Sequence, residues 1–79
     1  MDILLDCRND LKQLHEQLAQ ALHFPDWYGK NLDALHDCLT DLCQQVTITV
    51  MYGELMPNLL AVLTDSAGEN PYITIIILE

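Results

Sequence analysis

Short apolar segments of strand length alternate along this chain with longer segments whose apolar residues follow helical spacing. The strand-like segments are residues 2–7, 46–52 and 72–78. The helical segments are residues 11–23, 32–43 and 55–67. Strands separated by helices pair in parallel through right-handed crossovers. The sequence therefore predicts a single α/β domain, 1–79, with the order β-α-α-β-α-β and two layers, a three-stranded parallel sheet covered by helices.

Polar residues and prolines mark where the predicted helices begin and end. Asp10 and Gln13 can form a capping box ahead of the first helix, and Pro25 ends that helix. Asn31 is a suitable N-cap for the second helix, and Pro57 fits the first turn of the third.

The last strand-like segment, YITIIIL at 72–78, is the strongest strand prediction in the chain. Residues 68–71 precede it and are expected to form a helix cap and a turn. Because a near-continuous apolar run is typical of a buried strand, we expect this strand to be the most buried of the three.

The chain is strongly acidic, with 12 Asp and Glu against 3 Lys and Arg and a net charge of −9. Such a charge repels nucleic acid and anionic membranes and attracts a basic partner, although acidic surfaces also serve solubility alone. We therefore expect no nucleic-acid binding. No apolar run approaches membrane-spanning length, so we expect no membrane insertion either.

The three cysteines, Cys7, Cys38 and Cys43, are an odd number without the spacing of metal ligands. The N-terminus lacks the basic region and the long apolar core of a signal peptide. Both observations favour a reduced, cytoplasmic protein over a disulfide-stabilised secreted one.

A stripe of acidic residues runs along the second predicted helix. Asp33, Asp37 and Asp41 are four residues apart, so they lie on one helix face and repel one another. An ordinary solvated face would carry the same pattern. However, Trp27 and Tyr28 lie just ahead of this helix, and exposed aromatics beside charge are typical of interface anchors. The alternative for both rings is that they close over the core.

Paired carboxylates such as Asp33 and Asp37 can also serve in acid–base catalysis or in metal binding. Catalytic pairs need a cleft that separates their pKa values, and metal sites need converging ligands from another element. His15 is expected on the polar face of the first helix and His23 at its end. The single serine, Ser66, has no triad partners at a recognisable spacing. We expect neither an enzyme nor a bound metal or cofactor.

The segment PDWYGKNLDALHDCLTDL, residues 25–42, resembles the signature of the barstar family, intracellular inhibitors of the extracellular ribonuclease barnase. The resemblance is dense over these eighteen residues and weaker toward both ends of the chain. It implies the predicted α/β architecture, with the second helix and the loop before it plugging a ribonuclease active site. The family also carries an extra short helix after its second strand, which the shorter segment here is expected to lack.

Transferred by position, the resemblance implies roles for individual residues. Asp37 would replace the substrate phosphate, and Asp33 beside it would pair with an arginine. Trp27 stands where the family has a tyrosine that packs on the catalytic histidine. The loop residues Tyr28, Gly29 and Asn31 and, on the last helix, Asp65 complete the expected contacts.

Three positions depart from the family pattern on the expected contact face. His36 and Leu42 replace tryptophans, and Asp41 replaces a glycine. A histidine beside Asp37 would make binding pH-sensitive, unless it is an ordinary surface histidine. The extra charge at Asp41 favours a more basic target, so the partner need not be barnase itself.

The sequence thus predicts an inhibitor of a basic, guanyl-specific, barnase-like ribonuclease or ribonuclease toxin, monomeric when free. The alternative is an acidic interaction module of the same fold with a partner that is not a ribonuclease.

Overall fold

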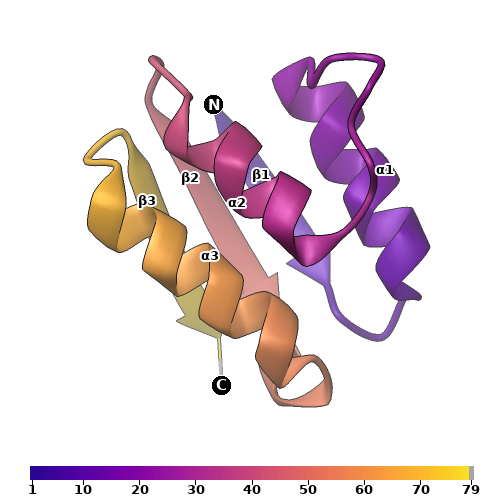
Figure 1. Ribbon diagram of the computed structural model, residues 1–79. Coiled ribbons are helices and arrows are strands. Elements are labelled where there is room, and N and C mark those ends of the chain that lie inside the picture. Colours follow the sequence, from indigo (N-terminus) through magenta and orange to yellow (C-terminus); the bar gives the residue numbers. More distant parts are fainter. Residues whose placement is uncertain (79) are drawn as a thin grey trace.

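The structure, a computed structural model, describes residues 1–78 and contains one parallel sheet (Figure 1). Its strands are β1 (Asp2–Asp6), β2 (Val46–Met51) and β3 (Ile73–Leu78). They lie in the order β1-β2-β3, so β2 is central, and Ile48 pairs with Ile3 on one side and Ile75 on the other. The predicted parallel, three-stranded α/β arrangement and its order are confirmed.

The helices lie on one face of this sheet (Figure 1). They are α1 (Leu11–Leu22), α2 (Leu32–Thr40) and α3 (Pro57–Glu69). Strand residues that point to this face are buried, namely Ile3, Leu5, Val46, Ile48, Val50 and Ile73. The core forms between these residues and the inner leucines of the helices. None of the helices within residues 1–78 is long and apolar enough to cross a membrane.

The strand β3 is not the most buried strand, so that prediction is wrong. Ile76, Ile77 and Leu78 are each more than 40% exposed, whereas every second residue of β2 is fully buried. The reason is position: β3 lies at a sheet edge, and the helices cover only one face. Apolar composition alone does not reveal which strand is central.

Local capping signals place the beginnings of α1 and α2 correctly. The Asp10 carboxylate accepts a hydrogen bond from the Gln13 backbone N–H at 2.8 Å. The Asn31 side chain accepts one from the Ala34 backbone N–H, also at 2.8 Å. The helix α1 ends at Leu22, ahead of Pro25, because His23 turns into the left-handed conformation at φ 56°.

The extents of α2 and α3 and the conformation of the segment after β2 differ from prediction. The helix α2 ends at Thr40 rather than near residue 43. The helix α3 begins at Pro57 and continues through Gly68 to Glu69, so residues 68–71 are not all cap and turn. A short 3₁₀-helix, η1 (Gly53–Leu55), occupies the segment after β2 that was expected to lack a helix.

Candidate functional site

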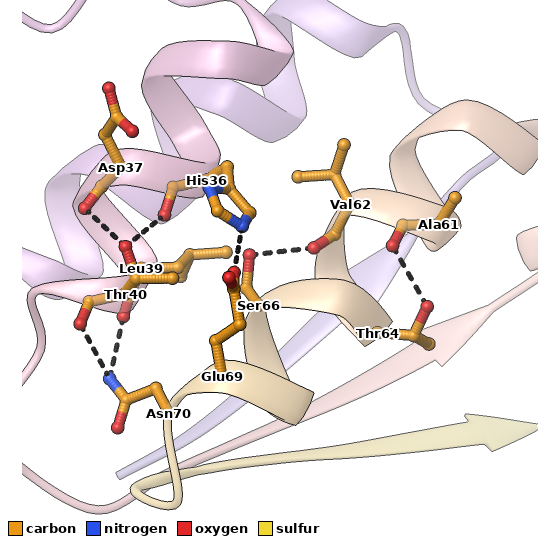
Figure 2. Close-up of polar contacts among 10 residues, drawn as sticks. All are labelled: His36, Asp37, Leu39, Thr40, Ala61, Val62, Thr64, Ser66, Glu69 and Asn70. Atoms are coloured by element: carbon orange, nitrogen blue, oxygen red, sulfur yellow. Dashed lines mark hydrogen bonds and ion pairs between the residues drawn. The ribbon is translucent and has the colours of Figure 1, made fainter.

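The outward face of α2 carries exposed carboxylates. Asp33 and Asp37 project from the helix, and Asp41 is exposed immediately after it. Leu35 and Leu39 on the opposite face of α2 are buried in the core. Their burial turns the face with the three carboxylates toward solvent. None of the three carboxylates forms a salt bridge with any residue of the described part of the chain. In Figure 2 the Asp37 carboxylate points away from α3 and from the other labelled side chains.

The two neighbouring aromatic residues of the loop have opposite environments. The Trp27 side chain is 74% exposed, whereas Tyr28 is only 8% exposed and belongs to the core cluster. The Tyr28 ring packs edge-on against Phe24, with centroids 4.9 Å apart. Trp27 therefore exposes an aromatic surface to solvent, while the Tyr28 ring closes over the core.

The backbone between Tyr28 and α2 is tightly constrained. A Cβ atom on Gly29 would lie 2.9 Å from the Asn31 amide nitrogen, so a side chain at Gly29 would press on the cap of α2. Lys30 adopts the left-handed conformation at φ 53°, and its ammonium group lies 3.3 Å from the Glu16 carboxylate. The loop thus holds Gly29 and Asn31 exposed at the positively polarised N-terminus of α2.

A second group of polar side chains lies between α2 and α3. His36 is half-buried, and its Nε2 atom contacts the Glu69 carboxylate of α3 (Figure 2). Asp65 lies on the same side of α3 and lines a shallow groove with His36 and Glu69. The structure therefore brings Asp65 to the edge of the α2 surface. His36 is tied to α3, which an ordinary unattached surface histidine would not be.

The remaining departures from the family pattern lie at the end of α2. Leu42 is half-buried and packs against the core cluster, so only part of its side chain is exposed. The thiol of Cys38, on the inner side of α2, has its pKa raised by burial and then by the negative charges of Asp41 and Asp37. The negative charges of Asp41 and Asp37 therefore also act on a buried group of the same helix.

The described residues contain no group of three or more His, Cys, Asp or Glu side chains that could hold a metal ion. The exposed carboxylates of Asp33, Asp37 and Asp41 are separated by about one turn each along α2. The chemistry of this acidic face is that of an acceptor surface for cationic groups supplied by another molecule.

The comparisons with known proteins agree with this geometry. The family model described as "Barstar (barnase inhibitor)" matches residues 2–67. This chain belongs to the barstar family. The barstar match includes the acidic face (Asp33, Asp37 and Asp41), the Trp27–Gly29 loop and Asp65, and it ends before β3.

A relative from Bacillus subtilis (strain 168), named "Putative ribonuclease inhibitor YrdF", is 52% identical over 40 residues. These residues make up 48% of this chain and 44% of that relative, so the similarity spans less than half the length of the relative. Barstar family membership therefore rests on the longer match to the family model.

Two residues outside the barstar signature turn out to support the site. The Asn70 side-chain amide donates hydrogen bonds to the carbonyl oxygens of Leu39 and Leu42, both at 2.9 Å, and so satisfies the end of α2 (Figure 2 shows Leu39 and Asn70). Nothing local signals this contact, since Asn70 is 31 residues from Leu39.

His15 is the other such residue. It is 2% exposed and contacts the Tyr28 hydroxyl, so its predicted place on a polar helix face is wrong. Its spacing of three residues from Leu18 and four from Leu11 places it on the apolar side of α1, and that spacing was the available signal.

Proposed function

We propose that this protein inhibits a basic, extracellular, guanyl-specific ribonuclease of the barnase type, or a toxin domain with that activity. The observation that carries the proposal is the set of unpaired carboxylates on α2 beside the exposed Trp27, in a chain of the barstar family. An inhibitor of this kind would occupy the active site and exclude RNA from it.

Asp37 is the proposed substitute for a substrate phosphate. A ribonuclease active site concentrates cationic groups to bind phosphate, and a carboxylate without an internal cation partner is free to accept from them. Hydrogen bonds between carboxylates and guanidinium groups are short and often bidentate. Asp33, one turn earlier on α2, would accept from a neighbouring arginine.

The loop supplies the rest of the central contact. The Trp27 ring is positioned to stack on a planar or cationic group of the enzyme. Gly29 and Asn31 present backbone and side-chain polar groups next to it. The buried Tyr28 ring holds this loop against the core.

The edge of the surface would set the choice of target. Asp41 continues the negative charge past Asp37 at the end of α2, and Asp65 adds charge at the groove that it lines with His36 and Glu69. Both additions favour an enzyme with additional basic residues around its active site. His36 and Leu42 replace tryptophans of the family, so the apolar part of the contact is smaller than in barstar itself. The target therefore need not be barnase itself.

The net charge of −9 would accelerate encounter with a cationic enzyme, and added salt would reduce the effect. The inhibitor would act as a monomer in the cytoplasm, as an immunity protein or antitoxin that protects its producer. The thiols Cys7, Cys38 and Cys43 are free in the structure, which suits a reducing compartment.

An inhibition assay tests the proposal directly. Several basic, secreted, guanyl-specific ribonucleases are titrated with the protein at low and high salt, and cleavage of an RNA substrate is followed. We expect stoichiometric inhibition of at least one enzyme, with an association rate that falls as salt rises. If all of them remain fully active, the acidic interaction module with a different partner becomes the better description.

A further inference from the structure

The contact between His15 and Tyr28 links α1 to the loop that carries Trp27. The Nδ1 atom of His15 contacts the Tyr28 hydroxyl in the protein interior. The other ring nitrogen, Nε2, is buried and has no hydrogen-bond partner within residues 1–78. A histidine buried with only one of its two nitrogens hydrogen-bonded is costly, so its presence here calls for an explanation.

The position of the Tyr28 ring determines the course of the loop. Tyr28 lies between Trp27 and Gly29, and its backbone N–H donates to the Pro25 carbonyl at 2.9 Å. Its ring is held on one side by Phe24, and its hydroxyl by His15. Moving the hydroxyl away from His15 would therefore move the backbone that presents Trp27.

We propose that His15 is a positioning residue that holds the Trp27–Gly29 loop in its binding conformation through Tyr28, and that it does so only while its ring is neutral. This inference rests on the proposed function for its consequence in binding. The contact itself is a property of the free protein and can be tested without a ribonuclease.

The neutral ring fits the site and the charged ring does not. A neutral ring either accepts from the Tyr28 hydroxyl at Nδ1 or donates to its oxygen from Nδ1. Protonation places a hydrogen on both nitrogens, which leaves a buried, charged Nε2–H group without an acceptor. Turning the ring toward solvent removes this cost, and it breaks the contact with Tyr28.

The burial of His15 and the positive charge of Lys30 act in the same direction. Burial foremost, and then the positive charge of Lys30, lower the pKa of His15 below its ordinary value of 6.5. Lys30 is paired with Glu16 at the surface. Burial foremost, and then Cys38, raise the pKa of Tyr28, so its hydroxyl keeps its proton. No carboxylate is among the groups that shift the pKa of His15.

The sign of the pH dependence follows. Between the ordinary pKa of histidine and the lowered pKa of His15, the unfolded or opened form binds more protons than the closed form. The closed loop is therefore fully favoured above pH 6.5 or so. It loses this advantage as the pH falls from there through the lowered pKa of His15.

Trp27 provides the measurement, because it is the only tryptophan in the chain and lies in the loop itself. Its fluorescence emission and anisotropy are recorded on the free protein from about pH 8 to about pH 4.5, the range in which histidine titrates. Far-ultraviolet circular dichroism is recorded in parallel. We expect a Trp27 transition with a midpoint below the ordinary pKa of histidine, while the helix signal is retained.

Two substitutions assign the transition. His15→Gln removes the titrating group, and Tyr28→Phe keeps the ring but removes the hydroxyl, so each is expected to abolish the Trp27 transition. Glu16→Gln is the matched control, since it changes the neighbouring residue of α1 and breaks only the exposed Lys30 pair. That variant should retain the transition.

The possible outcomes separate this inference from the proposed function. A parent protein without a transition, a transition that persists in either variant, or one that coincides with loss of the helix signal would overturn the role of His15. Inhibition of a ribonuclease would still be open in each case. Conversely, a His15-dependent transition in a protein that inhibits no ribonuclease would support the loop contact and refute the proposed target.

Discussion

The acidic face of α2 and the uncovered face of the sheet are both open to solvent, yet they differ in chemistry. The first presents repelling carboxylates and one tryptophan, while the second presents apolar side chains such as Leu4, Ile76 and Leu78. A charged side chain in water costs the fold little free energy. Apolar side chains remain exposed on the sheet because no second layer of helices covers that face. The difference teaches that exposure alone does not indicate function, and that unpaired charge of one sign beside an exposed aromatic is the more informative surface.

The largest expected effect is on the acidic face. Asp37→Ala should weaken inhibition by about 2–5 kcal/mol, because a cationic group of the enzyme would be left buried and unpaired. This corresponds to roughly 30-fold to 5000-fold in the dissociation constant. The matched control is Asp2→Ala, which removes an exposed carboxylate from the uncovered face of the sheet.

Stopped-flow association and competition dissociation measurements on the two variants check this prediction. The effect of Asp37→Ala should lie mainly in a faster dissociation rate. If Asp2→Ala weakens the complex as much, the two faces do not differ in binding and net charge alone explains the affinity.

A smaller effect is expected at Asn70, whose hydrogen bonds stabilise the end of α2. Asn70→Ala removes the donor to the Leu39 and Leu42 carbonyl oxygens and should lower the free energy of unfolding by about 1–3 kcal/mol. Asn58→Ala, at an exposed position in the first turn of α3, is the matched control and should change it little. Urea denaturation of the two variants provides the comparison, and equal midpoints would mean that Asn70 does not support α2.

These two residues also show how far the sequence could predict the structure. The exposed position of Asp37 on α2 could be predicted from local information, since helical spacing, the Asn31 cap and the neighbouring aromatics are all encoded within one segment. Asn70 acts across 31 residues, on carbonyl groups that any sequence would supply, so no pattern marks it. The same limit explains the error on β3, because a strand's place at the centre or edge depends on which strands pair.

The loop shows that limit at the level of single side chains. Trp27 and Tyr28 are adjacent and both aromatic, and the sequence left open whether they close over the core. The structure separates them because Tyr28 contacts His15 of α1, thirteen residues earlier in the chain. Which ring faces the core is thus decided by a helix on which neither residue lies.

A still smaller effect tests whether the carboxylates are truly unpaired. Asp37 is four residues from both Asp33 and Asp41, so Asp37→Asn relieves repulsion on both sides and should raise the free energy of unfolding by a few tenths of a kcal/mol, roughly. Asp33 lies in the first turn of α2, where the helix dipole favours a negative charge. Asp33→Asn should therefore change stability less or lower it.

Chemical denaturation at low salt measures both differences, and high salt should reduce them. A loss of stability in Asp37→Asn would mean that its carboxylate has a favourable partner within the protein. In that case the acidic face would not be free to accept cations from another molecule.

The smallest effect is expected on the uncovered face of the sheet. Ile76→Thr keeps a β-branched side chain on an exposed position of β3, so it should leave inhibition unchanged and shift the free energy of unfolding by less than about 0.5 kcal/mol. The same substitution at the fully buried Ile48 of β2 should cost about 2 kcal/mol or more, because it opens space and buries a hydroxyl. Denaturation midpoints and inhibition assays on this pair measure the contrast. Weaker inhibition in Ile76→Thr, with stability intact, would make the apolar face part of the binding surface and remove the distinction between the two faces.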